Sequence, residues 1–235
     1  DVLGSRGLGD VYKRQVSTAP GAGGIAVIRI SGPEAIAICN TIFVPRTAGK
    51  GLLSQKAYTL RYGSIRRGEE LIDEVLIALF RAPHSFTGED TVEITCHGSV
   101  YIQQQIMQLL IERGCRSALP GEYTQRAFMN GKMDLSQAEA VADLIASTSA
   151  GQHRLALNQM RGGFSHELKN LREQLLHITS LMELELDFSD HEELEFADRS
   201  ELSTLAAHIE TVISRLANSF SVGNAIKNGI PVAII

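Results

Sequence analysis

The sequence predicts an α+β protein in which a mixed α/β domain is followed by long antiparallel helices of a helical domain. Two observations support this fold class. Residues 16–132 contain several short runs with the two-residue period of strands, together with two helical patterns. From residue 133 almost to the end, apolar residues recur every three or four positions, which is the period of a helix. We therefore expect two domains, over residues 16–132 and 133–222.

The composition is that of an ordinary globular protein. Of its 235 residues, 44% are hydrophobic and 21% charged, and the net charge of -5 gives no overall attraction to nucleic acid, so any RNA contact needs a local patch. The three cysteines, Cys39, Cys96 and Cys115, form no C-x-x-C pair, which argues against a zinc site and fits a reducing cytosol. No apolar run approaches the roughly 20 residues of a membrane span. We expect a cytoplasmic protein with no membrane contact.

A glycine-rich loop and a short strand begin the first domain. The loop over residues 18–24 leads into an apolar strand at residues 25–30. Phosphate cradles lead into a helix, so this loop indicates close backbone approach to some ligand more than a phosphate site. Arg29 is the lone charge in the strand; it either points to solvent or supplies a guanidinium to a carboxylate or polar ligand. The next residues, Ser31-Gly-Pro-Glu34, predict a helix with Pro33 at its first position.

The remaining regular elements of this domain follow from turn and cap signals. Tyr58–Ile65 and Leu71–Phe80 predict a hairpin around a charged turn that contains glycine. Ser99 is a candidate cap for a helix that Gly114 ends, and a further short strand is expected at residues 116–119.

The stretch SFTGEDTVEITCHG (Ser85–Gly98) lies at the centre of the domain. Apolar residues alternate here with Glu93, Thr95 and His97, which indicates a strand with one apolar and one polar face. Such a strand can deliver a carboxylate and an imidazole to a ligand crevice at its carboxyl end. An antiparallel strand with one wet face would show the same pattern.

Helical patterns dominate the second domain. Ser136-x-x-Glu139 resembles a capping box, and Gly162–Gly163 predicts a break before a long helix. A seam of apolar residues is expected along that helix: Leu168, Leu171, Leu175, Ile178 and Met182. A second helix from Ser200 is long enough to fold back antiparallel on it. The acidic connector at residues 187–195 has irregular spacing, which favours a solvated turn over a metal site.

The two ends differ from the rest of the chain. Residues 1–15 show no helical or strand period, and we expect them to be a non-native leader. The apolar run at the other end has the composition of a buried parallel strand, and we assign residues 223–235 to a truncated strand. We expect the chain to be a fragment of a longer protein.

Four blocks of sequence carry a family resemblance. They are GGIAVIRISGP, SFTGEDTVEITCHG, PGEYTQRAFMNGKMDLSQAEAVADLI and the long-helix stretch that ends in LDF. In this order they resemble the MnmE (TrmE) family of tRNA-modification GTPases, from Thr18 to Ile235.

The resemblance implies both an architecture and an activity. It implies a folate-binding and dimerisation domain over residues 16–132, the first part of a helical domain, and a GTPase domain whose first strand is truncated here. The implied activity is carboxymethylaminomethyl modification of the wobble uridine (position 34) of tRNA. The implied partners are a second copy of the chain as a homodimer, the flavoprotein MnmG and tRNA. GTP, Mg and K would belong to the GTPase domain, whose G-x-x-x-x-G-K-[ST] motif has no match in this sequence.

By position in the matching motifs, the family's tetrahydrofolate-binding residues correspond to Arg29, Glu93 and Lys132. A carboxylate is a natural acceptor for the amide and amino edge of a pterin, and the two cations suit anionic or carbonyl oxygens of a 5-formyl or 5,10-methylene tetrahydrofolate. No catalytic residue is carried over, because no cysteine lies in a matching context. No metal ligand is carried over either. The alternatives are a non-catalytic folate-binding or dimerisation module, in which the three residues form a structural ion network, and a relative of the folate-dependent aminomethyl transferases.

Overall fold

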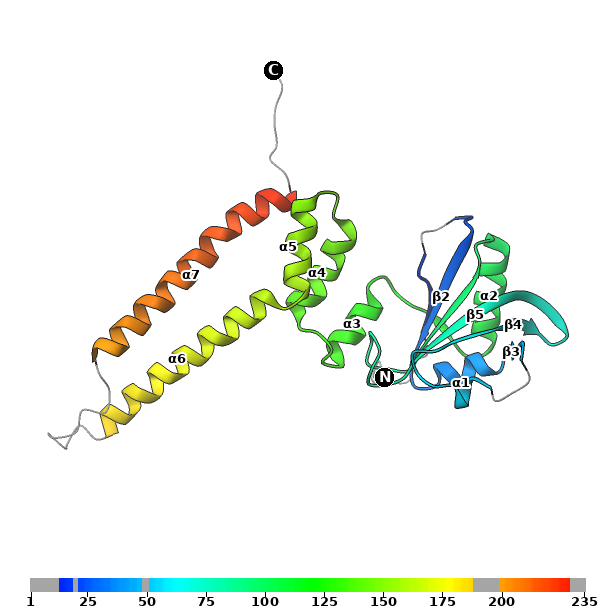
Figure 1. Ribbon diagram of the computed structural model, residues 1–235, viewed down its shortest axis with the longest axis horizontal. Helices are drawn as coiled ribbons and strands as arrows, with labels where there is room; N and C mark the ends of the chain where they lie inside the picture. Colours follow the sequence, from blue (N-terminus) through cyan, green and yellow to red (C-terminus); the bar gives the residue numbers. More distant parts are fainter. Residues whose placement is uncertain (1–12, 19–20, 48–50, 188–198, 229–235) are drawn as a thin grey trace, which may run out of the picture. The chain divides into compact units, whose positions relative to one another are not determined.

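The computed structural model describes residues 13–18, 21–47, 51–187 and 199–228 (Figure 1). The chain divides into two compact units between Met133 and Asp134. The first unit contains a sheet and the second contains helices, so the predicted α+β class is confirmed.

A sheet of seven strands, counted over the described residues, organises the first unit in the order β3-β4-β5-β6-β2-β1-β7. Its neighbouring strands are antiparallel except β1 and β7, which are parallel. The strands are β1 (Lys13–Val16), β2 (Ile25–Ser31), β3 (Phe43–Pro45), β4 (Leu60–Arg67), β5 (Glu70–Phe80), β6 (Thr91–His97) and β7 (Arg116–Ser117). The helices of this unit are α1 (Ala35–Asn40), the short 3-10 helix η2 (Leu52–Ser54), α2 (Val100–Glu112) and α3 (Glu122–Met129).

One face of the central strands forms the hydrophobic core. Ile28 of β2, Ile77 of β5 and Ile94 of β6 are fully buried in one cluster with apolar residues of α1 and α2. Glu93 and Thr95 alternate with these positions and remain half-buried. Because β6 is antiparallel to both of its neighbours, the second interpretation of its pattern, a strand with one wetter face, is the correct one.

Three features of this unit differ from what the sequence led us to expect. β1 begins at Lys13, so the end of the range assigned to a leader forms a strand; a segment this short shows no period, and its pairing with β2 is what makes it a strand. The assignment of residues 1–15 to a non-native leader stays a prediction. Helix α1 begins at Ala35, because Gly32 has a φ of 143° and accepts a hydrogen bond from the Ala35 N–H at 3.1 Å, which places Pro33 in a preceding turn. Helix α3 was not predicted at all. The β4–β5 hairpin around Gly68, with a φ of 61°, is confirmed.

The second unit consists of α4 (Leu135–Ala146), α5 (Ala150–Met160), α6 (Gly163–Asp187) and α7 (Arg199–Asn228) over the described residues. The Gln137 side chain donates to the Met160 carbonyl at 3.0 Å, so the start of α4 meets the end of α5 and the two helices are antiparallel. Gly162, with a φ of 81°, makes the predicted break before α6. An ion pair between Glu167 of α6 and Arg215 of α7 confirms that the last helix folds back on the long one.

The capping box of α4 lies two residues earlier than predicted. The Asp134 carboxylate accepts from the Gln137 N–H at 2.9 Å, and the Gln137 side chain accepts from the Asp134 N–H at 2.9 Å. Ser136 and Glu139 are therefore inside the helix. Asp and Gln satisfy the same orphan donors as Ser and Glu, so two overlapping patterns competed in the sequence.

The predicted apolar seam of α6 is only partly packed. Leu171 of α6 and Ile209 of α7 are buried, but Leu168, Leu175 and Met182 are about half exposed. Residues 223–228, assigned from the sequence to a truncated strand, belong to helix α7. An established helix can continue through a residue such as Gly223 at a cost of about 1 kcal/mol. The acidic connector beyond Asp187 and the apolar run after Asn228 lie outside the described residues. None of the described helices combines the length and apolar composition needed to cross a bilayer.

Candidate functional site

The antiparallel register of β2 and β6 places Arg29 directly opposite Glu93. The guanidinium donates to Glu93 Oε1 from Nε at 2.8 Å and from Nη2 at 2.5 Å. The two side chains are 32% and 25% exposed, so the pair is sheltered yet reachable from solvent. Two predicted site residues, separated by 64 positions, are therefore in direct contact.

Helix α3 supplies a third member of this cluster, Tyr123. Its hydroxyl donates to the main-chain carbonyl oxygen of Arg29 at 2.7 Å, and the Arg29 guanidinium lies 5.6 Å from the centre of its ring. Tyr123 is buried, and this burial raises the pKa of its hydroxyl, although Arg29 and Arg126 oppose the shift. The phenol therefore remains a protonated donor at neutral pH.

Charged residues fix α3 against the loop that precedes β6. Arg126, almost fully buried, pairs with Glu89 of that loop, and Glu89 also accepts from the Ser31 hydroxyl at 2.9 Å. On the same face of α3, Glu122 accepts two hydrogen bonds from Arg116, at 2.6 and 3.1 Å. This part of the fold is held by paired buried charges, each of which leaves its partner stranded if removed.

Lys132, the third predicted residue, lies in the turn after α3. Its Nζ donates to the Pro83 carbonyl at 3.0 Å, and its stem lies against Gly88, where a Cβ would lie 3.3 Å from Lys132 Cγ and Cδ. Among the described residues, no hydrogen bond or ion pair joins Lys132 to Arg29 or Glu93. The structure thus brings Arg29 and Glu93 together, but it does not bring Lys132 into contact with either; Lys132 lies against the loop of residues 83–90 instead.

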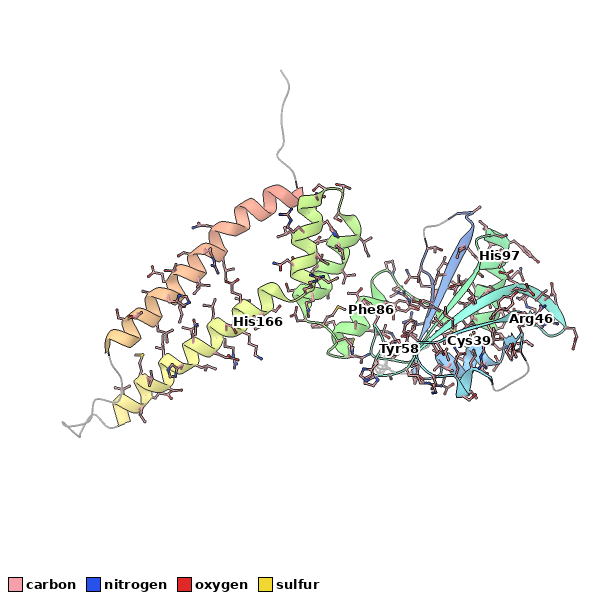
Figure 2. The ribbon with its side chains drawn as sticks, in the orientation of Figure 1. Cys39, Arg46, Tyr58, Phe86, His97 and His166 are labelled. Atoms are coloured by element: carbon pink, nitrogen blue, oxygen red, sulfur yellow. The ribbon has the colours of Figure 1, made fainter. Side chains whose placement is uncertain are left out.

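His97 belongs to a different location. It lies four residues after Glu93, about 13 Å along the strand at the usual rise. Its Nδ1 is 2.7 Å from Asp73 Oδ1, and its main-chain N–H donates to Asp73 Oδ2 at 2.8 Å. His97 is labelled on the sheet unit in Figure 2. This pair ties the end of β6 to β5, so the carboxylate and the imidazole singled out in the sequence do not share one site.

Sequence reasoning missed Tyr123, Arg126 and Glu89. The buried face of α3 consists of Glu122, Tyr123, Arg126 and Ala127, which recur with the period of a helix. Two of the four are charged, so a search for hydrophobic periodicity does not detect the helix. The four residues share no property that would mark them as one face, so only the tertiary contacts reveal it.

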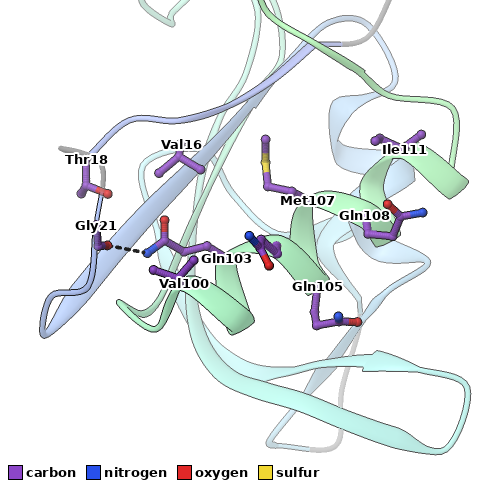
Figure 3. Close-up of a pocket in the computed structure, with 10 residues that line it drawn as sticks. Val16, Thr18, Gly21, Val100, Gln103, Gln105, Met107, Gln108 and Ile111 are labelled. Atoms are coloured by element: carbon purple, nitrogen blue, oxygen red, sulfur yellow. Dashed lines mark hydrogen bonds between the residues drawn. The ribbon is translucent and has the colours of Figure 1, made fainter.

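A separate groove of about 870 Å³ lies between α2 and the residues Val16, Thr18 and Gly21 (Figure 3). Its polar lining consists mainly of glutamine amides, and Gln103 donates to the Gly21 carbonyl at 3.3 Å. The described residues that line the groove include no charged side chain, whereas Arg29 and Glu93 form a charged pair. We therefore place the candidate site at Arg29 and Glu93.

The cysteines and the acidic residues suggest no further chemistry. Cys39, Cys96 and Cys115 are buried, and none of the three is in a disulfide. Burial, with a smaller contribution from Asp73, raises the pKa of the Cys96 thiol to about 11, and burial raises that of Cys39 as well. Thiols that stay protonated are poor nucleophiles. In the part of the chain that the structure describes, no group of three His, Cys, Asp or Glu side chains is arranged to hold a metal ion.

This sheet unit and helical unit correspond to two known protein domains. The domain described as "GTP-binding protein TrmE N-terminus" matches residues 15–132, and the "MnmE helical domain" matches residues 135–231. Together they define the amino-terminal and helical domains of the TrmE (MnmE) class of GTP-binding proteins.

Individual relatives agree with this class. The chain is 80% identical over 221 residues to the tRNA modification GTPase MnmE of Parabacteroides distasonis, covering 94% of this chain and 48% of the relative. It is 71% identical over 220 residues to MnmE of Bacteroides fragilis and 58% identical over 220 residues to that of Flavobacterium johnsoniae; each match covers 94% of this chain and 47% of the relative. The chain belongs to the MnmE (TrmE) family, and it spans about half the length of these relatives.

Proposed function

We propose that this chain forms the tetrahydrofolate-binding domain and part of the helical domain of a GTPase that modifies the wobble uridine (position 34) of tRNA. The family membership supports the overall activity, because the relatives are named tRNA modification GTPases. The observation that carries the folate assignment is the direct contact of Arg29 with Glu93 on a sheltered but accessible strand pair.

The donor set at this location suits a reduced folate. Glu93 would accept from the amide and amino edge of the pterin, and Arg29 and Lys132 would donate to its carbonyl and carboxylate oxygens. When bound, a 5-formyl or 5,10-methylene tetrahydrofolate would supply the one-carbon unit. The chain's own residues bind and orient the ligand, and the rigid strand pair β2–β6 holds two of them in fixed register.

The whole protein is longer than this chain, and we propose its assembly as follows. The protein acts as a homodimer through its amino-terminal domain, in the cytoplasm, with the flavoprotein MnmG and tRNA as partners. GTP, Mg and K bind within the remaining half of the relatives' length. Two observations are compatible with this proposal. The three cysteines are buried and form no disulfide, and α6 exposes Leu168, Leu175 and Met182, an apolar stripe that further helices could cover.

The test is the affinity for 5-formyltetrahydrofolate, measured by titration calorimetry. Glu93→Ala should weaken binding by about 1–3 kcal/mol, because it leaves polar groups of the ligand and Arg29 without an acceptor. Glu74→Ala is the matched control, since Glu74 forms an exposed pair with Arg46 on the same sheet. Unchanged affinity in a folded Glu93→Ala variant would favour a purely structural ion pair.

A further inference from the structure

The Arg29 guanidinium is restrained from more than one side. Glu93 holds two of its nitrogens from the neighbouring strand, and the Tyr123 ring lies 5.6 Å from its central carbon. A guanidinium above an aromatic face is attracted by the negative charge of the ring's π-system. Arginine is otherwise rich in rotamers, so the ring and Glu93 together restrict how the donors of Arg29 are presented.

The ring is itself held in place by independent contacts. The Tyr123 hydroxyl bonds to the Arg29 main chain, which anchors α3 to β2. Asn130 at the end of α3 donates to the Thr87 carbonyl at 2.7 Å, and Arg126 pairs with Glu89. These contacts fix the helix at both ends, so the ring can act as a rigid wall behind the guanidinium.

We propose that Tyr123 is a positioning residue for ligand binding at Arg29: its ring sets the orientation in which the guanidinium meets the folate. This inference rests on the proposed function, because it requires that Arg29 touches the ligand. The two parts of the side chain have different roles. The ring positions Arg29, and the hydroxyl stabilises the attachment of α3 to the sheet.

The experiment compares two substitutions of Tyr123 in the full chain by titration with 5-formyltetrahydrofolate. Tyr123→Phe keeps the ring and should change the dissociation constant less than about twofold, although it removes a buried hydrogen bond and lowers the urea midpoint. Tyr123→Leu removes the ring and should raise the dissociation constant about two- to tenfold, the range expected when one flexible side chain has to be ordered on binding. Leu109→Ala on the opposite face of the sheet is the control for lost stability alone, and it should leave the affinity unchanged.

A second background separates positioning from general damage. In Arg29→Ala protein, Tyr123→Leu should have no further effect on affinity, whereas a merely structural role would weaken binding in both backgrounds. Equal losses in the two backgrounds, or a loss above tenfold in Tyr123→Phe, would overturn the inference. If Tyr123→Leu does not fold, the folate affinity of Tyr123→Phe alone still decides whether the ring, without the hydroxyl, is enough to keep Arg29 competent for binding. If Arg29→Ala leaves folate affinity intact, the proposed function itself fails instead.

Discussion

Removing the Arg126 side chain should strongly destabilise the first unit. Arg126 is 4% exposed and pairs with Glu89, whose side chain is 17% exposed. Arg126→Met preserves much of the volume but leaves the Glu89 carboxylate without its cation. Breaking a buried ion pair from one side typically costs about 3–5 kcal/mol, a large part of the roughly 5–15 kcal/mol that holds a domain folded.

A double-mutant cycle can assign this loss of stability to the ion pair of Arg126 with Glu89. Glu122, the other acidic neighbour of Arg126, keeps its two hydrogen bonds from Arg116, so most of the loss should come from Glu89. Combining Arg126→Met with Glu89→Gln should therefore recover about 1–2 kcal/mol, because no unpaired charge remains. Urea unfolding, followed by circular dichroism and tyrosine fluorescence, measures each variant. A coupling energy below about 0.5 kcal/mol would refute the buried-pair argument.

Three further perturbations test other parts of the structure. Gly98→Ala should lower the free energy of unfolding in urea by about 2 kcal/mol or more, because the new Cβ would overlap the main-chain carbonyl oxygen of Gly23. Gly24→Ala is the control, since a Cβ there meets nothing within 4 Å; equal losses of stability in the two variants would contradict this packing. Native Cys96, with a thiol pKa of about 11 instead of 9.0, should react with iodoacetamide at pH 8 about a hundredfold more slowly than in the unfolded chain, as followed by peptide mass spectrometry. Labelling at the unfolded rate would show that the thiol is not protected. Asp134→Ala should lower the stability of the helical unit by about 1 kcal/mol and Glu139→Ala by much less, and the reverse order would favour the capping box first read from the sequence.

The regular strands and the long helices were predictable because each shows its period over many residues. The β4–β5 hairpin, the alternation in β6 and the break at Gly162 all follow from local chemistry. The pairing of Arg29 with Glu93 was different. Strand periodicity alone gives no register between strands so far apart in the chain, and only the family resemblance named the two residues together.

What the sequence could not indicate depends on contacts between distant segments. The first strand, at residues 13–16, exists because β2 and β7 pair with it. Helix α3 escaped detection because it buries Glu122 and Arg126, residues that normally mark an exposed face, and tertiary pairing with Arg116 and Glu89 is what makes their burial tolerable. The position of Tyr123 over Arg29 depends on that helix, so it could not be foreseen either.

Because Arg29 and Glu93 already satisfy each other, an incoming molecule has to displace a hydrogen bond before it gains one. A simple anion would engage the guanidinium but strand the half-buried carboxylate, and a simple amine would do the reverse. Only a compound that presents donors and acceptors side by side replaces both halves at once. Discrimination against phosphate, acetate and free amines would then arise from the bond that must be broken, rather than from any group built to repel them.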